Sequence, residues 1–155
     1  MIRYTVNSRT SLLNMPFYVT SLTVIGNTCN EETLTNLDLS SFKLLRSVVI
    51  GNNCFKYVLV FSIEGLNWLE SVTISSSSFT EDCYGSSIQG SRFRIVNCPR
   101  LKSLSIRYCS FSRYNGFELA QLPQLQTISF SEHTGWYISF GGATEAVFKG
   151  EDDCN

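Results

Sequence analysis

The chain has 155 residues, enough to bury a hydrophobic core without help from disulfides or metals. Its composition is 43% apolar and 16% charged, with a net charge of −1, which excludes a disordered chain and a strongly basic nucleic-acid-coating protein. Serine and threonine together number 34 whereas alanine occurs three times, so the composition excludes an all-helical bundle and favours strands.

An apolar pattern recurs five times along the chain. Its copies begin at Val19, Leu45, Leu69, Leu101 and Leu125. Each copy has four such positions, namely its start and the residues three, five and ten positions later. Of the resulting 20 positions, 19 are apolar. Composition alone predicts about 9 apolar residues among them, so the repeat is real. The alternation within each copy predicts a strand with one buried face near each start.

A second apolar set precedes each of the last four copies, at eight, six and three residues before the start. Its members are Leu37, Leu39, Phe42, Phe61, Ile63, Leu66, Phe93, Ile95, Cys98, Phe117, Leu119 and Leu122. The period of two predicts a second, shorter strand or extended segment in each repeat, and no helix. Each repeat then buries two sets of apolar side chains that face each other.

The third repeat carries an insertion over residues 80–92. The starts of successive copies are 26, 24, 32 and 24 residues apart, and the longest spacing contains this segment. Its glycines and serines predict a loop that leaves the stack, with Tyr84 and Arg92 as candidate contact residues. The alternative is a neutral surface excursion, because lengthening a loop costs little free energy.

One further slot lies eight residues after each start, where a compact side chain would hydrogen-bond backbone groups left unpaired as the chain turns out of its strand. It holds Asn27, Asn53, Ser77, Cys109 and His133. With the apolar positions, this slot resembles the leucine-rich repeat pattern Leu-x-x-Leu-x-Leu-x-x-Asn/Cys-x-Leu over roughly residues 13–147. Repeats with Asn-Cys-Phe after the strand are similar to leucine-rich repeats of divergent unicellular eukaryotes. His133 departs from the pattern, so we expect a distorted or final fifth repeat.

The resemblance implies a mainly β leucine-rich repeat solenoid. A parallel sheet would line its concave face, and short strands or extended segments would form the opposite wall. Residues 1–155 would form a single leucine-rich repeat domain of about five repeats. Because neither end shows a cap, we expect the chain to be a segment of a longer array.

Small hydroxyl residues separate the buried positions of the predicted strands and align in two columns. One interpretation is that they keep an exposed sheet soluble. The other is a docking surface with hydroxyls at its floor and larger side chains at its margin. These margin residues are Arg46, Asn52, Glu70, Lys102, Arg107 and Tyr108. Arg107 and Tyr108 are of the types that dominate binding energy at interfaces.

Catalytic and cofactor signals are weak in this sequence. His133, the only histidine, and Cys109 both occupy repeat slots, so a nucleophilic pair would require both to leave the stack. The six cysteines lack metal-ligand spacing, and Gly51-Asn52-Asn53 does not fit a phosphate loop. The sequence therefore predicts no enzyme, no metal and no cofactor. Basic residues are spread singly, which argues against a nucleic-acid partner.

The compartment is only weakly indicated. The longest apolar stretch, residues 57–61, is far shorter than the roughly 20 residues of a membrane-spanning helix. The cysteines show no Cys-x-x-Cys pair, and we expect them to be reduced and mostly buried. No secretory signal or Asn-x-Ser/Thr acceptor is present, so the cytoplasm is slightly favoured.

Three functions remain open. The first is a non-enzymatic protein-protein interaction scaffold that docks an unidentified protein partner on its concave sheet or on the 80–92 loop. The second is the ligand-recognition part of a larger receptor or enzyme, for example a kinase-linked one. The third is an adhesive repeat protein at a cell surface. The fold resemblance favours protein binding only by analogy.

Overall fold

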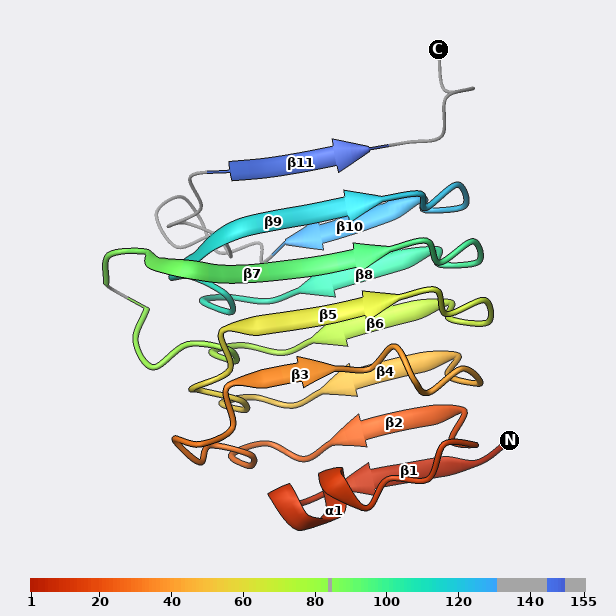
Figure 1. The fold of residues 1–155 in the computed structure, drawn as a ribbon, viewed down its shortest axis with the longest axis horizontal. Helices are drawn as coiled ribbons and strands as arrows, with labels where there is room; N and C mark the ends of the chain where they lie inside the picture. Colours follow the sequence, from red (N-terminus) through yellow and green to blue (C-terminus); the bar gives the residue numbers. More distant parts are fainter. Residues whose placement is uncertain (84, 131–144, 150–155) are drawn as a thin grey trace.

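A computed structural model describes residues 1–83, 85–130 and 145–149, without the side-chain surroundings of 130 and 145–149. These residues form two parallel sheets (Figure 1). Sheet A contains, in spatial order, β1 (Arg3–Val6), β2 (Ser21–Val24), β4 (Ser47–Ile50), β6 (Ser71–Ile74), β8 (Ser103–Ile106) and β10 (Thr127–Phe130). Sheet B contains β3 (Asn36–Asp38), β5 (Val60–Glu64), β7 (Ile88–Val96), β9 (Tyr114–Ala120) and β11 (Glu145–Lys149).

From β2 onward the chain passes alternately between the two sheets, and the strands of sheet B run opposite to those of sheet A (Figure 1). Every strand pair of the described residues is parallel, and equivalent residues of consecutive repeats face each other; Ser47, for example, pairs with both Ser21 and Ser71. Both sheets have open edges, so these strands form no closed barrel. The prediction of a mainly β chain with parallel sheets and little helix is confirmed.

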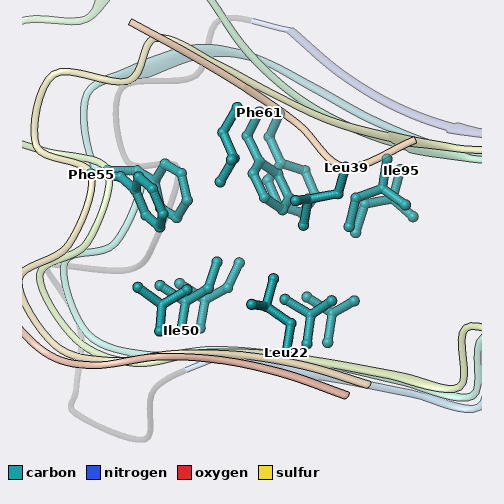
Figure 2. Packing of buried hydrophobic residues seen from close by; sticks show 14 of the residues in the cluster. Leu22, Leu39, Ile50, Phe55, Phe61 and Ile95 are labelled. Carbon is teal, nitrogen blue, oxygen red and sulfur yellow. The ribbon is translucent and has the colours of Figure 1, made fainter. Parts of the chain in front are cut away.

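The hydrophobic core lies between the two sheets. Figure 2 shows Leu22 and Ile50 from sheet A opposite Phe61 and Ile95 from sheet B. Two columns of phenylalanine rings run along the stack. One joins Phe55, Phe79 and Phe111, with ring centroids 5.2 and 4.4 Å apart, and the other joins Phe61, Phe93 and Phe117, with centroids 5.2 and 5.1 Å apart. Stacked rings in adjacent repeats add to the stabilisation from burial.

Two strands of sheet B are longer than expected, whereas β3 has three residues and is short, as predicted. β7 has nine residues and β9 has seven, compared with four in each strand of sheet A. The reason lies in the insertion, because its last part, from Ile88 to Arg92, belongs to β7. The register shifts between these two residues, and Gly90 lies there with a φ of +85°, which glycine adopts at no steric cost.

The first eighteen residues contribute more than the partial repeat expected from the sequence. β1 extends sheet A, and a short helix, α1 (Arg9–Leu13), follows it. Ser8 and Ser11 form a reciprocal capping box at the start of this helix. Leu12 and Met15 are buried in the core cluster. These residues therefore close the core beside β1.

The position eight residues after each repeat start, the polar slot of the sequence pattern, lies in the turn after each sheet A strand. The structure gives a different reason for its residue types from the hydrogen bonding that the sequence suggested. Asn27, Asn53, Ser77 and Cys109 all have a left-handed backbone, with φ between +57° and +73°. Asparagine tolerates this region better than other residues with a side chain. Backbone conformation is therefore the property that these four residues share. His133 lies outside the described residues.

Buried side-chain hydrogen bonds between consecutive turns come from the next position, which holds Thr28, Cys54, Ser78 and Ser110. The Ser78 hydroxyl accepts a bond from the N–H of Cys54 at 3.1 Å and donates to the carbonyl of Gly51 at 2.7 Å. Ser110 accepts a bond from the N–H of Ser78 at 3.0 Å in the same way. Ser78 and Ser110 are fully buried, and their bonds satisfy backbone groups inside the stack.

Candidate protein-binding surface

The outer face of sheet A carries the two predicted columns of small residues. Register aligns Ser21, Ser47, Ser71, Ser103 and Thr127 in one column and Thr23, Val49, Thr73, Ser105 and Ser129 in the other. These side chains are exposed or half-buried, whereas those between them point into the core, apart from Ile128 on the edge strand, which is exposed. The hydroxyls of Ser21 and Ser47 lie 3.0 Å apart, so part of this face is satisfied internally.

The candidate margin residues divide into two groups at opposite ends of the sheet A strands. Arg46, Glu70 and Lys102 precede the strands and lie on consecutive rungs. The N–H of Glu70 donates to the carbonyl of Arg46 at 2.8 Å, and the N–H of Lys102 donates to that of Glu70 at 2.9 Å. Arg107 and Tyr108 follow the end of β8, so the length of a four-residue strand, about 13 Å, separates the two groups.

Asn52 belongs to the group at the strand ends, and its amide oxygen has a structural role. This oxygen accepts a hydrogen bond from the N–H of Ser76 in the next turn at 2.9 Å. The carbonyl of Tyr108 accepts a backbone bond from Ser77 at 2.9 Å. Tyr108 is half-buried and Arg107 is exposed. The structure therefore assigns Asn52 to the connection between turns.

Trp68 is the residue that the sequence analysis missed at the strand-start margin. Its side chain is 39% exposed, and two guanidinium carbons lie over its ring, that of Arg100 at 4.1 Å and that of Arg46 at 5.3 Å from the centroid. Both distances are within the range of cation–π attraction. The signal was available in the sequence, because Tyr18, Leu44, Trp68 and Arg100 each stand one residue before a repeat start.

Arg92 does not join this margin. It lies in β7 of sheet B, paired with Val60 and Gly116, and its side chain is exposed. The expectation that Arg92 belongs to a loop is therefore wrong, because the end of the insertion continues strand β7. Tyr84 lies outside the described residues.

The remainder of the insertion is fastened to the following turn. Cys83 forms a disulfide with Cys109, with Cα atoms 5.3 Å apart. The Arg113 guanidinium donates to the carbonyl of Ser86 at 3.0 Å, and the hydroxyl of Ser112 donates to the carbonyl of Asp82 at 3.2 Å. Residues 80–83 and 85–87 thus form a loop, as expected, and side chains of the next repeat hold it in place.

The disulfide also corrects the expectation that the cysteines are reduced. Cys29, Cys54 and Cys98 are free and buried, as expected, and Cys154 lies outside the described residues. Burial raises the pKa of the Cys29 thiol to about 11 and also raises that of Cys98, so both thiols are protonated near neutral pH. Cys109 has its sulfur bonded to Cys83 and therefore offers no nucleophilic thiolate.

A shallow polar pocket of about 380 Å³ lies beside the first turn, lined by residues that include Asn7, Asn27, Cys29 and Glu31. Its only thiol is the protonated Cys29. Within the described ranges, no three His, Cys, Asp or Glu side chains gather as metal ligands. In the same ranges, no helix is long and apolar enough to cross a membrane.

The outer face of sheet B is charged. Arg94 donates hydrogen bonds to Glu64 and Glu118, both at 2.7 Å. The Arg94 guanidinium lowers the pKa of the Glu64 carboxyl, chiefly through this hydrogen bond. Sheet B therefore presents an arginine paired with two carboxylates, whereas the margin of sheet A presents arginines stacked on an aromatic ring.

Comparison with known proteins does not assign this chain to a family. No family model, no curated protein and no solved structure matches this chain.

Proposed function

We propose that this chain is a non-enzymatic leucine-rich repeat solenoid whose sheet A surface binds a protein partner. The repeat pattern of the sequence and the two stacked parallel sheets support the solenoid. Such a stack presents a long exposed sheet that consists of equivalent positions, which suits recognition of an extended surface.

The observation that carries the proposal is the exposed Trp68 between Arg46 and Arg100, beside the small-residue face of sheet A. Tryptophan and arginine are the residue types that dominate binding energy at interfaces. Stacking on Trp68 also holds the two arginine side chains in place, which reduces the conformational entropy lost on binding.

Site-specific photocrosslinking in the source cells tests this proposal. A photoreactive residue placed at Ser71, on the outer face of sheet A, should form adducts with a defined partner protein. The same residue at Ser62, on the outer face of sheet B, is the matched control. Adducts should disappear in the Trp68→Ala background. Equal adducts from both positions would refute the assignment of sheet A as the binding surface. Adducts at Ser71 that persist without Trp68 would refute the role of Trp68 in binding.

A second candidate function is recognition or adhesion at a cell surface, and the disulfide between Cys83 and Cys109 favours it. Such bonds persist in oxidising compartments and are rare in the cytosol. Counting free thiols in protein quenched directly from the source cells distinguishes the two locations. Full alkylation of Cys83 and Cys109 without reductant would place the protein in a reducing compartment and remove this candidate.

A further inference from the structure

Trp68 lies within a cluster of exposed side chains that we call the Trp68 margin. It comprises Tyr18, Leu44, Arg46, Trp68, Arg100 and Lys102, which immediately precede or follow the repeat starts. The margin lies along the turns that lead into β2, β4, β6 and β8, at the right of Figure 1. Tyr18 is 60% exposed and Leu44 is 45% exposed, so the margin has an apolar portion.

Consecutive members of the margin lie on neighbouring rungs. The backbone bonds that run from Thr20 through Arg46 and Glu70 to Lys102 have lengths of 2.7 to 2.9 Å. Rungs of a parallel sheet are about 4.8 Å apart. The margin is therefore a stripe along the stack, apolar at Tyr18 and Leu44 and cationic at Arg100 and Lys102.

The charge of this stripe differs from that of the whole chain. Arg46, Arg100 and Lys102 contribute three positive charges, and Glu70 is the one acid in the same rows, whereas the whole chain has a net charge of −1. Glu118 and Glu64 neutralise Arg94 on sheet B, and Glu81 lies 3.9 Å from Arg113. In the described part of the chain, no carboxylate lies within 4 Å of the Arg46 or Arg100 guanidinium.

Resting on the proposed function, we propose that the Trp68 margin binds an acidic segment of the partner protein. A guanidinium that stacks on an aromatic face still presents its N–H groups at its edge, where they can bind a carboxylate in a bidentate manner. Carboxylates of the segment pair with Arg46 and Arg100, and an apolar side chain of the segment packs against Leu44 and Tyr18. This arrangement favours an extended peptide that follows the stripe across the rungs.

Fluorescence anisotropy of labelled peptides tests the inference on the full chain. The probe is a ten-residue peptide of glutamate and leucine, and its counterpart has lysine in place of every glutamate. The acidic peptide should bind at least ten times more tightly than the basic one at low salt, and raising the salt concentration should weaken binding. Equal binding of the two peptides would overturn the inference.

Matched variants locate the site. Trp68→Ala, and Arg46→Ala combined with Arg100→Ala, should each weaken binding of the acidic peptide at least tenfold. The control combines Lys56→Ala with Arg92→Ala, which removes the same charge from residues outside sheet A and the margin and should change affinity less than twofold. Circular dichroism shows whether each variant is folded. If the control variant weakens binding as much as the Arg46→Ala and Arg100→Ala double variant, the effect depends on total charge alone and the site is refuted.

A ten-nucleotide thymidine strand provides a different polyanion. Tighter binding of this strand than of the acidic peptide would overturn the inference in favour of a nucleic-acid ligand. Failure of the peptide assay does not remove the proposed function, because the photocrosslinking experiment reads protein binding to sheet A whatever the chemistry of the partner. Crosslinking at Ser71 together with no peptide binding would refute the acidic segment alone.

Discussion

The phenolic hydroxyl of Tyr114 donates a 2.6 Å hydrogen bond to the carbonyl of Val58, which lies 56 residues earlier in the chain. Both residues stand thirteen positions after the start of their repeats, Tyr114 in the fourth and Val58 in the second. The equivalent residue of the third repeat is Asp82, where the insertion takes the chain outward and the side chain is exposed. The Tyr114 side chain thus bridges the repeat that contains the insertion.

Tyr114→Phe should lower the free energy of unfolding by about 1–3 kcal/mol, because it leaves the buried carbonyl of Val58 without its donor. Burial raises the pKa of Tyr114 well above its ordinary value, so the hydroxyl remains a donor across the neutral range. Urea unfolding at pH 7 measures the loss. Tyr18→Phe, at an exposed ring, is the control and should change stability by less than about 0.5 kcal/mol. Equal effects would contradict the role of the bridge.

Ser78→Ala should destabilise the fold by about 2 kcal/mol, because the N–H of Cys54 and the carbonyl of Gly51 then lose a buried partner. Ser78→Cys should recover part of this loss, since Cys54 occupies the equivalent slot one repeat earlier and its thiol donates to the carbonyl of Ile25. Chemical denaturation gives the three free energies. If Ser78→Ala is as mild as the exposed control Ser86→Ala, the hydrogen bonds between turns contribute nothing.

Asn53→Val should destabilise the protein by about 1–2 kcal/mol, because a β-branched residue is strained at a φ of +57°. Asn53→Gly should be nearly neutral, since glycine adopts this region without strain. Thermal unfolding compares the two variants, with Asn67→Val at an exposed position as control. A destabilisation by glycine as large as that by valine would show that the side chain of Asn53, and not its backbone, is required.

Cys83→Ser should lower stability by about 3 kcal/mol under oxidising conditions, because the disulfide closes a loop of 26 residues and restricts the unfolded chain. Adding a reductant should lower the stability of the wild-type protein by a similar amount and leave the variant unchanged. Mass spectrometry of a non-reduced digest should show the Cys83–Cys109 peptide. A wild-type protein that is insensitive to reductant would contradict this stabilisation.

The carboxyl of Glu64 should titrate below its ordinary pKa because it accepts a hydrogen bond from Arg94. A lowered pKa in the folded state means that the stabilising contribution is complete above the ordinary value for glutamate and is lost as the pH falls through the folded value. Carboxyl NMR shifts recorded from pH 7 to pH 2 measure this titration. Arg94→Met should return the pKa of Glu64 toward normal, and an unchanged titration in that variant would contradict the pairing.

The sequence by itself determined the spacing of the buried residues. Apolar side chains recur at fixed distances from each repeat start because every rung must bury the same positions against its neighbours, as Leu22, Val48 and Val72 do. This requirement is visible in a one-dimensional pattern, which also predicted the outward columns of hydroxyl residues. The parallel sheet on one face was an expectation from the resemblance of this pattern to leucine-rich repeats.

Only the tertiary structure decided which side chains join the rungs and which form the surface. Asn53 and Ser77 have a left-handed backbone, and the residues that follow them, Cys54 and Ser78, form the buried hydrogen bond between turns. The sequence pattern does not show this conformation. The contacts of Trp68 with Arg46 and Arg100 join residues 22 and 32 positions apart, which become neighbours only when consecutive repeats stack. The disulfide of Cys83 likewise depends on the insertion folding back onto the next turn, because its partner lies 26 residues away.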